Sequence, residues 1–190
     1  LIKQVTLFKN VENFLEKLKS LEKTDDFKKL NISVHHFIVS AGLKEYVELL
    51  VPEKLFTWVW GCRYSVIINE NDVNGENPES VPVFCMDETM KTRALFEITK
   101  GTSSDPKKEV NNKVQSEKLW CHFENLIYIG DGPTDVPALS LVRDRGGMGV
   151  VVYNKSKSTA DIKRRLGQMS ADKRCDLITA ADYSLDGELY

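Results

Sequence analysis

The sequence has few residues for a disulfide framework or a zinc site. Its four cysteines form no C-x-x-C pair and are far apart in the chain: Cys62, Cys85, Cys121 and Cys175. In a chain of 190 residues this pattern predicts reduced thiols in a cytoplasm. Of the three histidines, His35 and His36 are adjacent and would point to opposite faces of a strand. We therefore interpret the histidines as structural or surface residues rather than zinc ligands.

Long apolar runs and a strong charge imbalance are also missing. The longest runs, such as 126–129 and 148–153, are far too short to span a bilayer. The formal net charge of −2 indicates neither a nucleic-acid surface nor a membrane-binding basic face. Residues 1–9 lack the charged and apolar regions of a signal peptide. We expect a cytoplasmic protein with no nucleic-acid and no membrane partner. The sequence does not indicate the oligomeric state.

Helices and strands are predicted to alternate along the chain, which has the ordinary globular composition of 42% hydrophobic and 28% charged residues. Helical periodicity or β-prone runs predict the following segments: helix 10–22, strand 34–39, a helix that ends before Pro52, strand 56–60, hairpin runs 64–68 and 81–85, helix 90–99, strand 126–129, helix 134–143, strand 148–152, helix 158–168 and strand 177–179. Residues 101–118 are the most loop-like part. Such alternation predicts an α/β domain over residues 1–190, with a Rossmann-like parallel sheet, flanking helices and a β-hairpin insertion near 63–86.

The clearest candidate for chemistry follows the strand at 126–129. There the chain reads Gly-Asp-Gly-Pro-Thr-Asp, which places Asp131 and Asp135 four residues apart after a glycine turn. Mg²⁺ prefers hard oxygen ligands and usually takes only one or two carboxylates, with waters and phosphate completing its shell. The pair therefore suits Mg²⁺. The alternative is that Asp131 lies in a simple turn and Asp135 favours a helix N-terminus.

Two weaker candidates lie earlier in the chain. Ser40, Ala41 and Gly42 follow a predicted strand, where a hydroxyl and free N–H groups at a helix N-terminus would bind an anion. Ser40 could equally be a plain helix N-cap. Lys91, near the start of a predicted helix, could hold a phosphate and a carboxylate, although a single lysine is more often a solvated surface residue.

The order of these motifs resembles the haloacid dehalogenase-like hydrolases, and within them the phosphoserine phosphatase-like branch. The resemblance rests on Ser40 in HHFIVSAGL, Lys91 in ETMKTRALFEITKG, and Asp131 with Asp135 in LIYIGDGPTDVPALSLV. It implies a Mg²⁺-dependent phosphatase that hydrolyses a small phosphorylated substrate through an aspartyl-phosphate. Ser40 would then bind the phosphoryl group together with Ala41 and Gly42, and Lys91 would neutralise nucleophile and phosphate. Asp131 would bind Mg²⁺, and Asp135 would ligate or orient the metal.

The family's first motif, D-x-D-x-[TV], has no counterpart in the chain, because no D-x-D occurs in its 190 residues. In the family this motif supplies the nucleophile and the acid–base residue, and its strand lies between the serine strand and the Gly-Asp strand. Losing a central strand would cost more than the ~5–15 kcal/mol net stability of a domain. We therefore expect the chain to be a partial core domain that is inactive alone, with the first strand and any helical cap upstream.

Two other classes remain as alternatives. One is a non-catalytic pseudoenzyme that keeps the scaffold as a binding or regulatory module, although a scaffold alone requires none of the four polar residues named above. The other is a flavodoxin-like or nucleotide-binding domain. That class calls for a glycine-rich phosphate loop, and neither G-x-G-x-x-G nor G-x-x-x-x-G-K-[ST] is present.

Overall fold

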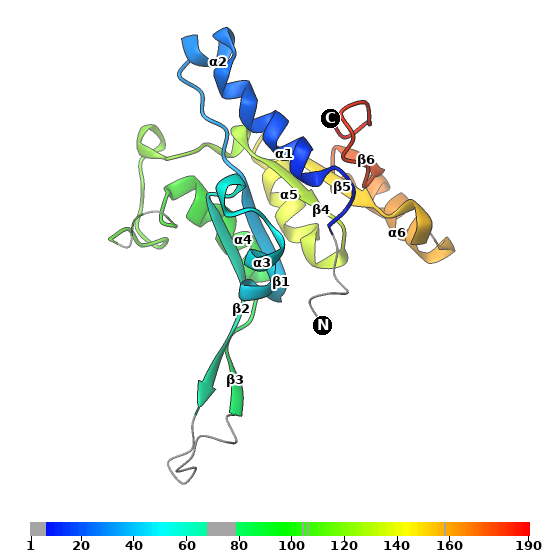
Figure 1. The fold of residues 1–190 in the computed structure, drawn as a ribbon, viewed down its shortest axis with the longest axis horizontal. Helices are drawn as coiled ribbons and strands as arrows, with labels where there is room; N and C mark the ends of the chain where they lie inside the picture. The colour runs from blue at the N-terminus through cyan, green and yellow to red at the C-terminus, as the bar shows by residue number, and fades with distance from the viewer. Residues whose placement is uncertain (1–6, 68–78, 104, 106, 158) are drawn as a thin grey trace. The chain divides into compact units, whose positions relative to one another are not determined.

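The protein is described by a computed structural model that covers all residues except 1–6, 68–78, 104, 106 and 158. Two compact units divide the described chain (Figure 1). Unit 1 consists of Leu15–Asp87, and unit 2 consists of Leu7–Phe14 together with Glu88–Tyr190. The tip of the predicted hairpin lies outside the described residues.

Six α-helices and six strands, with short 3₁₀ helices between them, make up the described chain. In chain order they are α1 (Val11–Ser20), η2 (Leu21–Lys23), α2 (Asp25–Lys29), β1 (Phe37–Leu43), α3 (Lys44–Leu50), η3 (Glu53–Leu55), β2 (Trp58–Ile67), β3 (Glu79–Phe84), α4 (Glu88–Lys100), η4 (Ser116–Lys118), η5 (Phe123–Asn125), β4 (Ile127–Gly130), η6 (Pro133–Asp135), α5 (Val136–Asp144), β5 (Met148–Tyr153), η7 (Lys155–Lys157), α6 (Ala160–Ala171) and β6 (Leu177–Ala180). The predicted α/β class is confirmed.

Unit 1 is built on a three-stranded sheet in the order β1-β2-β3. The first pair is parallel, with α3 as the crossover helix, and the second pair is an antiparallel hairpin, as expected for residues 63–86. The predicted boundary between strands 56–60 and 64–68 is wrong, because both runs belong to the single strand β2. Its first half pairs with β1 and its second half with β3, so one strand joins both parts of the sheet.

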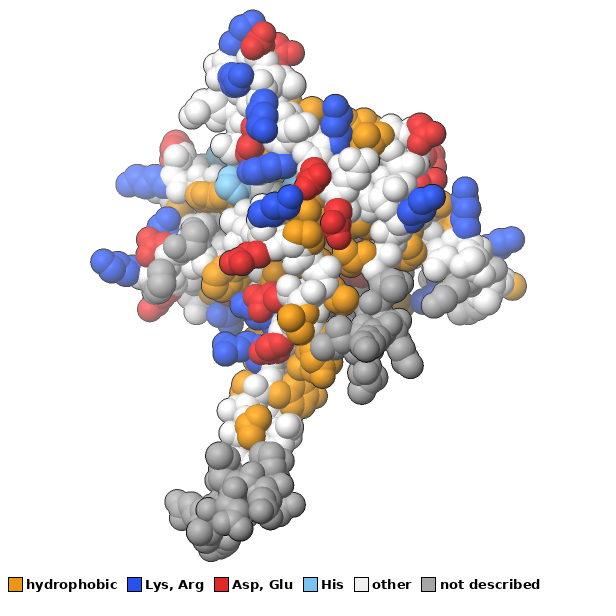
Figure 2. Space-filling view, in the orientation of Figure 1, with side chains coloured by type: hydrophobic (Ala, Val, Ile, Leu, Met, Phe, Trp, Pro, Cys, Tyr) orange, Lys and Arg blue, Asp and Glu red, His pale blue; other side chains and the backbone are white. Residues whose placement is uncertain are grey.

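The far part of the hairpin exposes apolar side chains. The exposed residues are Tyr64 (50% exposed), Val66 (61%), Ile67 (51%) and Val83 (58%). Figure 2 shows hydrophobic side chains gathered on this pair of strands. A two-stranded ribbon is marginal in water by itself, so pairing of the near part of β2 with β1 anchors the hairpin.

His36 is packed between β1 and the segment that leads into β2. Its Nδ1 lies 3.0 Å from the carbonyl oxygen of Leu55, which can only accept, so Nδ1 carries the proton. Its Nε2 is buried and has no hydrogen-bond partner among the described residues. Burial lowers the pKa of His36, and the bond to Leu55 opposes that shift only in part. The histidine is therefore packed as a neutral residue, in agreement with the structural interpretation.

Unit 2 contains a three-stranded parallel sheet in the order β4-β5-β6. Helix α5 packs on β4 and β5, and α4 packs on α5. The buried core of these elements is mainly aliphatic, and its members are Ala94, Leu95 and Ile98 of α4, Tyr128 of β4, Ala138, Leu139 and Val142 of α5, Val150, Val151 and Val152 of β5, and Ala180 of β6. The predicted helix 90–99 and strand 148–152 are confirmed as α4 and β5 to within two residues at each end.

A close backbone approach in unit 1 yields a prediction about Gly61. A Cβ atom at this position would lie 2.8 Å from the Cα of Lys44, closer than Cβ atoms pack. Gly61→Ala is expected to destabilise unit 1 by about 1–3 kcal/mol, because backbone must shift to admit the methyl group. Gly42→Ala is the matched control, since its Cβ would meet only side-chain atoms, the Oγ of Ser40 at 3.2 Å and a methyl group of Val47 at 3.9 Å. Equal urea midpoints for the two variants would contradict the prediction.

The neutral His36 yields a prediction about pH. Its pKa is lower in the folded than in the unfolded state, so the unfolded chain binds the extra proton first as pH falls. The neutral His36 therefore contributes fully to the free energy of unfolding above about pH 6.5, and this contribution is lost as the pH falls. Urea unfolding at pH 7.5 and pH 5 should show this loss. His36→Asn, whose amide can still donate to Leu55, should flatten the dependence; an unchanged pH profile would rule His36 out as its source.

Candidate functional site

Strand β4 presents one face to the core and one face outward. Tyr128 and Gly130 are buried, whereas Ile127 and Ile129 are exposed, which is the alternation of a strand with one covered face. Glycine is required at position 130, because a Cβ there would lie 2.6 Å from the Cβ of Asp135. The side chain of Asp135 therefore lies directly against the end of β4.

Apolar stripes on two helices bring Lys91 and Asp135 together. On α4 four of the five buried positions, Lys91, Ala94, Leu95 and Ile98, follow an i, i+3, i+4, i+7 pattern in which Lys91 takes the first place, and the fifth is Thr99. The same spacing recurs in Asp135, Ala138, Leu139 and Val142, which lead into and along α5. Because α4 packs on α5, both charged side chains are carried into the same interface and must pair there.

The resulting ion pair is short and almost completely buried. Lys91 Nζ lies 2.7 Å from Asp135 Oδ1, and each side chain is only 7% exposed. Lys91 Nζ also donates to Thr134 Oγ1 at 3.1 Å. An ammonium group has three N–H donors, and two described side chains accept from this one. The third N–H of Lys91 has no acceptor among the described residues.

The Asp135 carboxylate accepts four hydrogen bonds. Its Oδ1 accepts from Lys91 Nζ and from the hydroxyl of Tyr128, each at 2.7 Å. Its Oδ2 accepts from the backbone N–H groups of Asp131 at 3.3 Å and Gly132 at 3.2 Å. These four donors come from a helix, a strand and a loop, so Asp135 holds three elements to one another.

The hydroxyl of Tyr128 is a donor in this network at every ordinary pH. Burial raises the pKa of its phenol far above the usual range, and the negative charge and hydrogen bond of Asp135 raise the pKa further. The phenol therefore stays protonated. Tyr128 was not among the residues predicted for the site. The available signal was its position as the one residue with a hydroxyl in the apolar strand before the Gly-Asp turn.

Asp131 differs from Asp135 in exposure and in partners. Its side chain is exposed at the carboxyl end of β4, and its carboxylate makes no hydrogen bond or ion pair within the described part of the chain. The charge of Asp131 still acts nearby, because after burial it is the second cause that raises the pKa of Tyr183. Asp131 thus has an unengaged carboxylate, and its own backbone N–H and that of Gly132 donate to Asp135.

Ser40, Ala41 and Gly42 belong to unit 1, and the structure corrects their predicted place at a helix N-terminus. They lie inside strand β1 rather than at a helix N-terminus. The reason is an irregularity in register: β1 advances from Val39 to Leu43 while β2 advances only from Trp60 to Cys62. The extra residues bulge, and the backbone N–H of Gly42 donates to the Oγ of Ser40 at 3.0 Å. Helix α3 begins only at Lys44, without a side-chain cap.

A magnesium site can be tested against the donors present. No group of three or more histidine, cysteine, aspartate or glutamate side chains comes together in the part of the chain that the structure describes. Mg²⁺ needs only one or two carboxylates, and the free, exposed oxygens of Asp131 fit that demand. The Asp135 carboxylate does not fit a direct ligand, because four donors already surround it.

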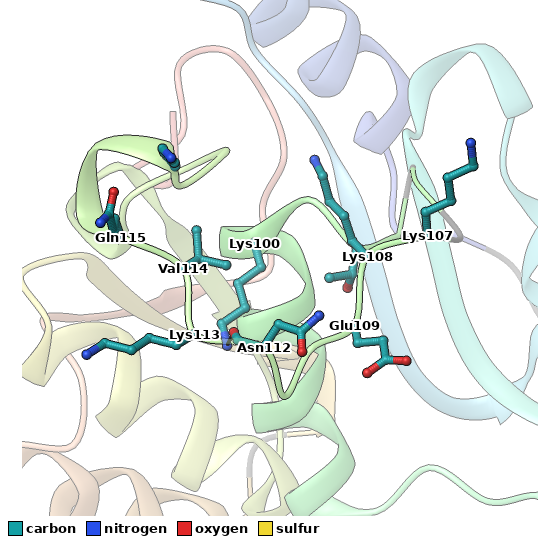
Figure 3. A pocket seen from close by; sticks show the side chains of 10 residues that line it. Lys100, Lys107, Lys108, Glu109, Asn112, Lys113, Val114 and Gln115 are labelled. Atoms are coloured by element: carbon teal, nitrogen blue, oxygen red, sulfur yellow. Dashed lines mark hydrogen bonds between the residues drawn. The ribbon is translucent and has the colours of Figure 1, made fainter.

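A pocket of about 520 Å³ lies beside the C-terminal end of α4 and the loop after it. Five lysines and Glu109 are among its lining residues. Figure 3 shows the side chains of Lys107, Lys108 and Lys113 directed away from one another. Lys100 donates to the carbonyl oxygens of Val110, at 2.5 Å, and Asn112, at 2.9 Å. Lys100 therefore holds the loop that lines the pocket.

Comparison with known proteins gives one relative of interest. The chain is 25% identical over 148 residues to an uncharacterized protein of Borreliella burgdorferi (strain ATCC 35210), and the match covers 74% of the chain. The chain spans about half the length of this relative, since 50% of the latter is covered. No protein-family model and no solved structure matches the chain. None of the described helices is long and apolar enough to cross a membrane.

The buried pair yields a prediction about Lys91. Lys91→Met removes the ammonium group and leaves a buried carboxylate without its counter-charge, which is expected to destabilise unit 2 by about 3 kcal/mol. Arg93→Met on the same helix is the matched control. It breaks a surface pair with Glu97 in which Arg93 is 55% exposed, and should change stability by less than about 1 kcal/mol. Similar urea midpoints for both variants would show that the Lys91 pair is not structural.

Proposed function

We propose that this chain is part of a cytoplasmic, Mg²⁺-dependent phosphomonoester hydrolase of the haloacid dehalogenase type. Its substrate is a small phosphorylated molecule, and its nucleophile lies outside these 190 residues. The observation that carries the proposal is the loop after β4. There an unengaged carboxylate, Asp131, stands beside a buried Lys91–Asp135 pair whose lysine retains one free donor.

The two acidic residues have different roles in this proposal. Asp131 is the metal ligand, because its oxygens are exposed and unengaged. Asp135 orients the loop after β4 by accepting from its backbone N–H groups. It does not bind the metal directly, because each of its oxygens already has two donors. Bound Mg²⁺ supplies positive charge that neutralises the phosphate oxygens.

Lys91 serves as a fixed positive charge toward the phosphate. Phosphoryl transfer asks a protein mainly for positioning and for neutralisation of charge on the transferred group. A buried ammonium group held by Asp135 and Thr134 is preorganised, so it need not reorient during the reaction. Its remaining N–H is the donor proposed for a phosphate oxygen.

The nucleophile is assigned to a strand that pairs with β4. In the described residues β4 is an edge strand, which pairs with β5 on one side and with no strand on the other. Such an edge has free backbone donors and acceptors that another strand can satisfy. A D-x-D strand there would deliver its carboxylates to the same end of the sheet as Asp131. The first carboxylate would attack phosphorus and expel the alcohol, which takes a proton from the second, and water would then hydrolyse the acyl phosphate.

The proposal predicts that Asp131 is essential in the longer gene product that contains this chain. Hydrolysis of p-nitrophenyl phosphate is expected to require Mg²⁺, and Asp131→Asn should lower the rate at least about a hundredfold. Asp144→Asn, an exposed acid at the end of α5, is the matched control and should retain the rate. The 190-residue chain alone should give no turnover.

Three outcomes would count against parts of the proposal. Mg²⁺-dependent hydrolysis that survives Asp131→Asn would remove Asp131 from the metal site. Turnover by the isolated chain would show that the nucleophile lies within it. A longer protein with no phosphatase activity on a panel of small phosphomonoesters would favour the non-catalytic alternative.

A further inference from the structure

We propose that Tyr128 is a positioning residue for this site: its hydroxyl fixes the Asp135 carboxylate and, through it, the loop backbone that carries Asp131. The importance of Asp131 rests on the proposed function, whereas the positioning contact rests on the geometry alone. Within the described residues the Tyr128 hydroxyl donates to Asp135 and makes no hydrogen bond to Lys91 or to the Asp131 side chain, which are the groups proposed to meet phosphate and metal.

The two carboxylate oxygens of Asp135 accept hydrogen bonds from different kinds of donors. Oδ1 meets the two side-chain donors, Lys91 and Tyr128, while Oδ2 meets the two loop amides of Asp131 and Gly132. The terminal torsion of an aspartate is broad, so a single donor on Oδ1 would leave the carboxylate plane free to turn. Donors from α4 and β4 together fix that plane. Oδ2 is then fixed where both amides can reach it.

Tyr128 is the more rigid of the two side-chain donors. Both residues are buried, with Lys91 5% and Tyr128 9% exposed, but the lysine ammonium is linked to its backbone by four methylene groups, whereas the tyrosine has a rigid ring and belongs to a paired strand. Gly130, two residues along the same face, leaves the space in which the Asp135 side chain lies against β4. The strand thus provides both the donor and the contact surface for the carboxylate.

The loop amides have weaker bonds than the donors on the other oxygen. Asp131 N and Gly132 N lie 3.3 Å and 3.2 Å from Oδ2, whereas both contacts to Oδ1 measure 2.7 Å. The short bonds therefore determine where the carboxylate lies, and the loop follows it. Loss of one short bond should therefore weaken the hydrogen bonds of these two amides first.

Tyr128→Phe tests the proposal because it removes the hydroxyl and keeps the ring. In the longer gene product that contains this chain, without metal or substrate, the amides of Asp131 and Gly132 are expected to exchange with solvent about tenfold faster, and their proton resonances should move upfield. The amides of Val151 and Val152, in the central strand β5, should keep their exchange rates. Tyr153→Phe is the matched control in the same sheet, and it should leave all four amides unchanged.

Two results would overturn the proposal. Unchanged exchange and shifts at Asp131 and Gly132 would show that the hydroxyl does not position the loop. Uniform acceleration that includes Val151 and Val152 would show that Tyr128 only contributes to global stability. Because this readout uses no metal or substrate, it stands apart from the phosphatase test. In an active longer protein, Tyr128→Phe should also raise the Mg²⁺ concentration for half-maximal rate about tenfold, a smaller effect than the loss of rate expected for Asp131→Asn.

Discussion

Burial of an ammonium group and a carboxylate in the interface between α4 and α5 constrains the whole of unit 2. Neither Lys91 nor Asp135 could remain there alone, because an unpaired buried charge costs several kcal/mol. Their pairing therefore requires α4 and α5 to pack at one register. The loop after β4 is then tied to the same point, because Asp135 also accepts from the backbone of Asp131 and Gly132. Helix packing, strand position and loop geometry thus depend on one carboxylate.

This arrangement separates the holding of the loop from the chemistry that the loop could perform. Asp135 is buried and surrounded by donors, which makes it a poor metal ligand and an effective anchor. Asp131 is exposed and unengaged, although it lies only four residues away. Two carboxylates of equal chemistry acquire different roles because one precedes an apolar stripe and the other lies at the turn. The carboxyl end of a parallel strand is where α/β proteins commonly bind ligands.

The segment Ser40–Ala41–Gly42 illustrates where residue patterns mislead. Serine and glycine after an apolar run are typical both of a helix N-cap and of a strand that bulges. The choice depends on a neighbour remote in the sequence: Gly61 of β2 admits the backbone of Lys44 at a distance that no side chain would allow. The strand can therefore continue past Ser40, and the helix begins later. Nothing within the segment itself carries that information.

Local periodicity was enough to predict most elements of the chain, including α4, β4, α5 and β5, because each has a clear helical or alternating pattern. Residue type and the Gly-Asp turn were also enough to nominate Lys91, Asp131 and Asp135. Only the tertiary structure decided which of them are buried, which pair, and that Tyr128 joins them. The physical reason is distance along the chain: Lys91 and Asp135 are 44 positions apart, and their contact exists only once α4 has packed on α5.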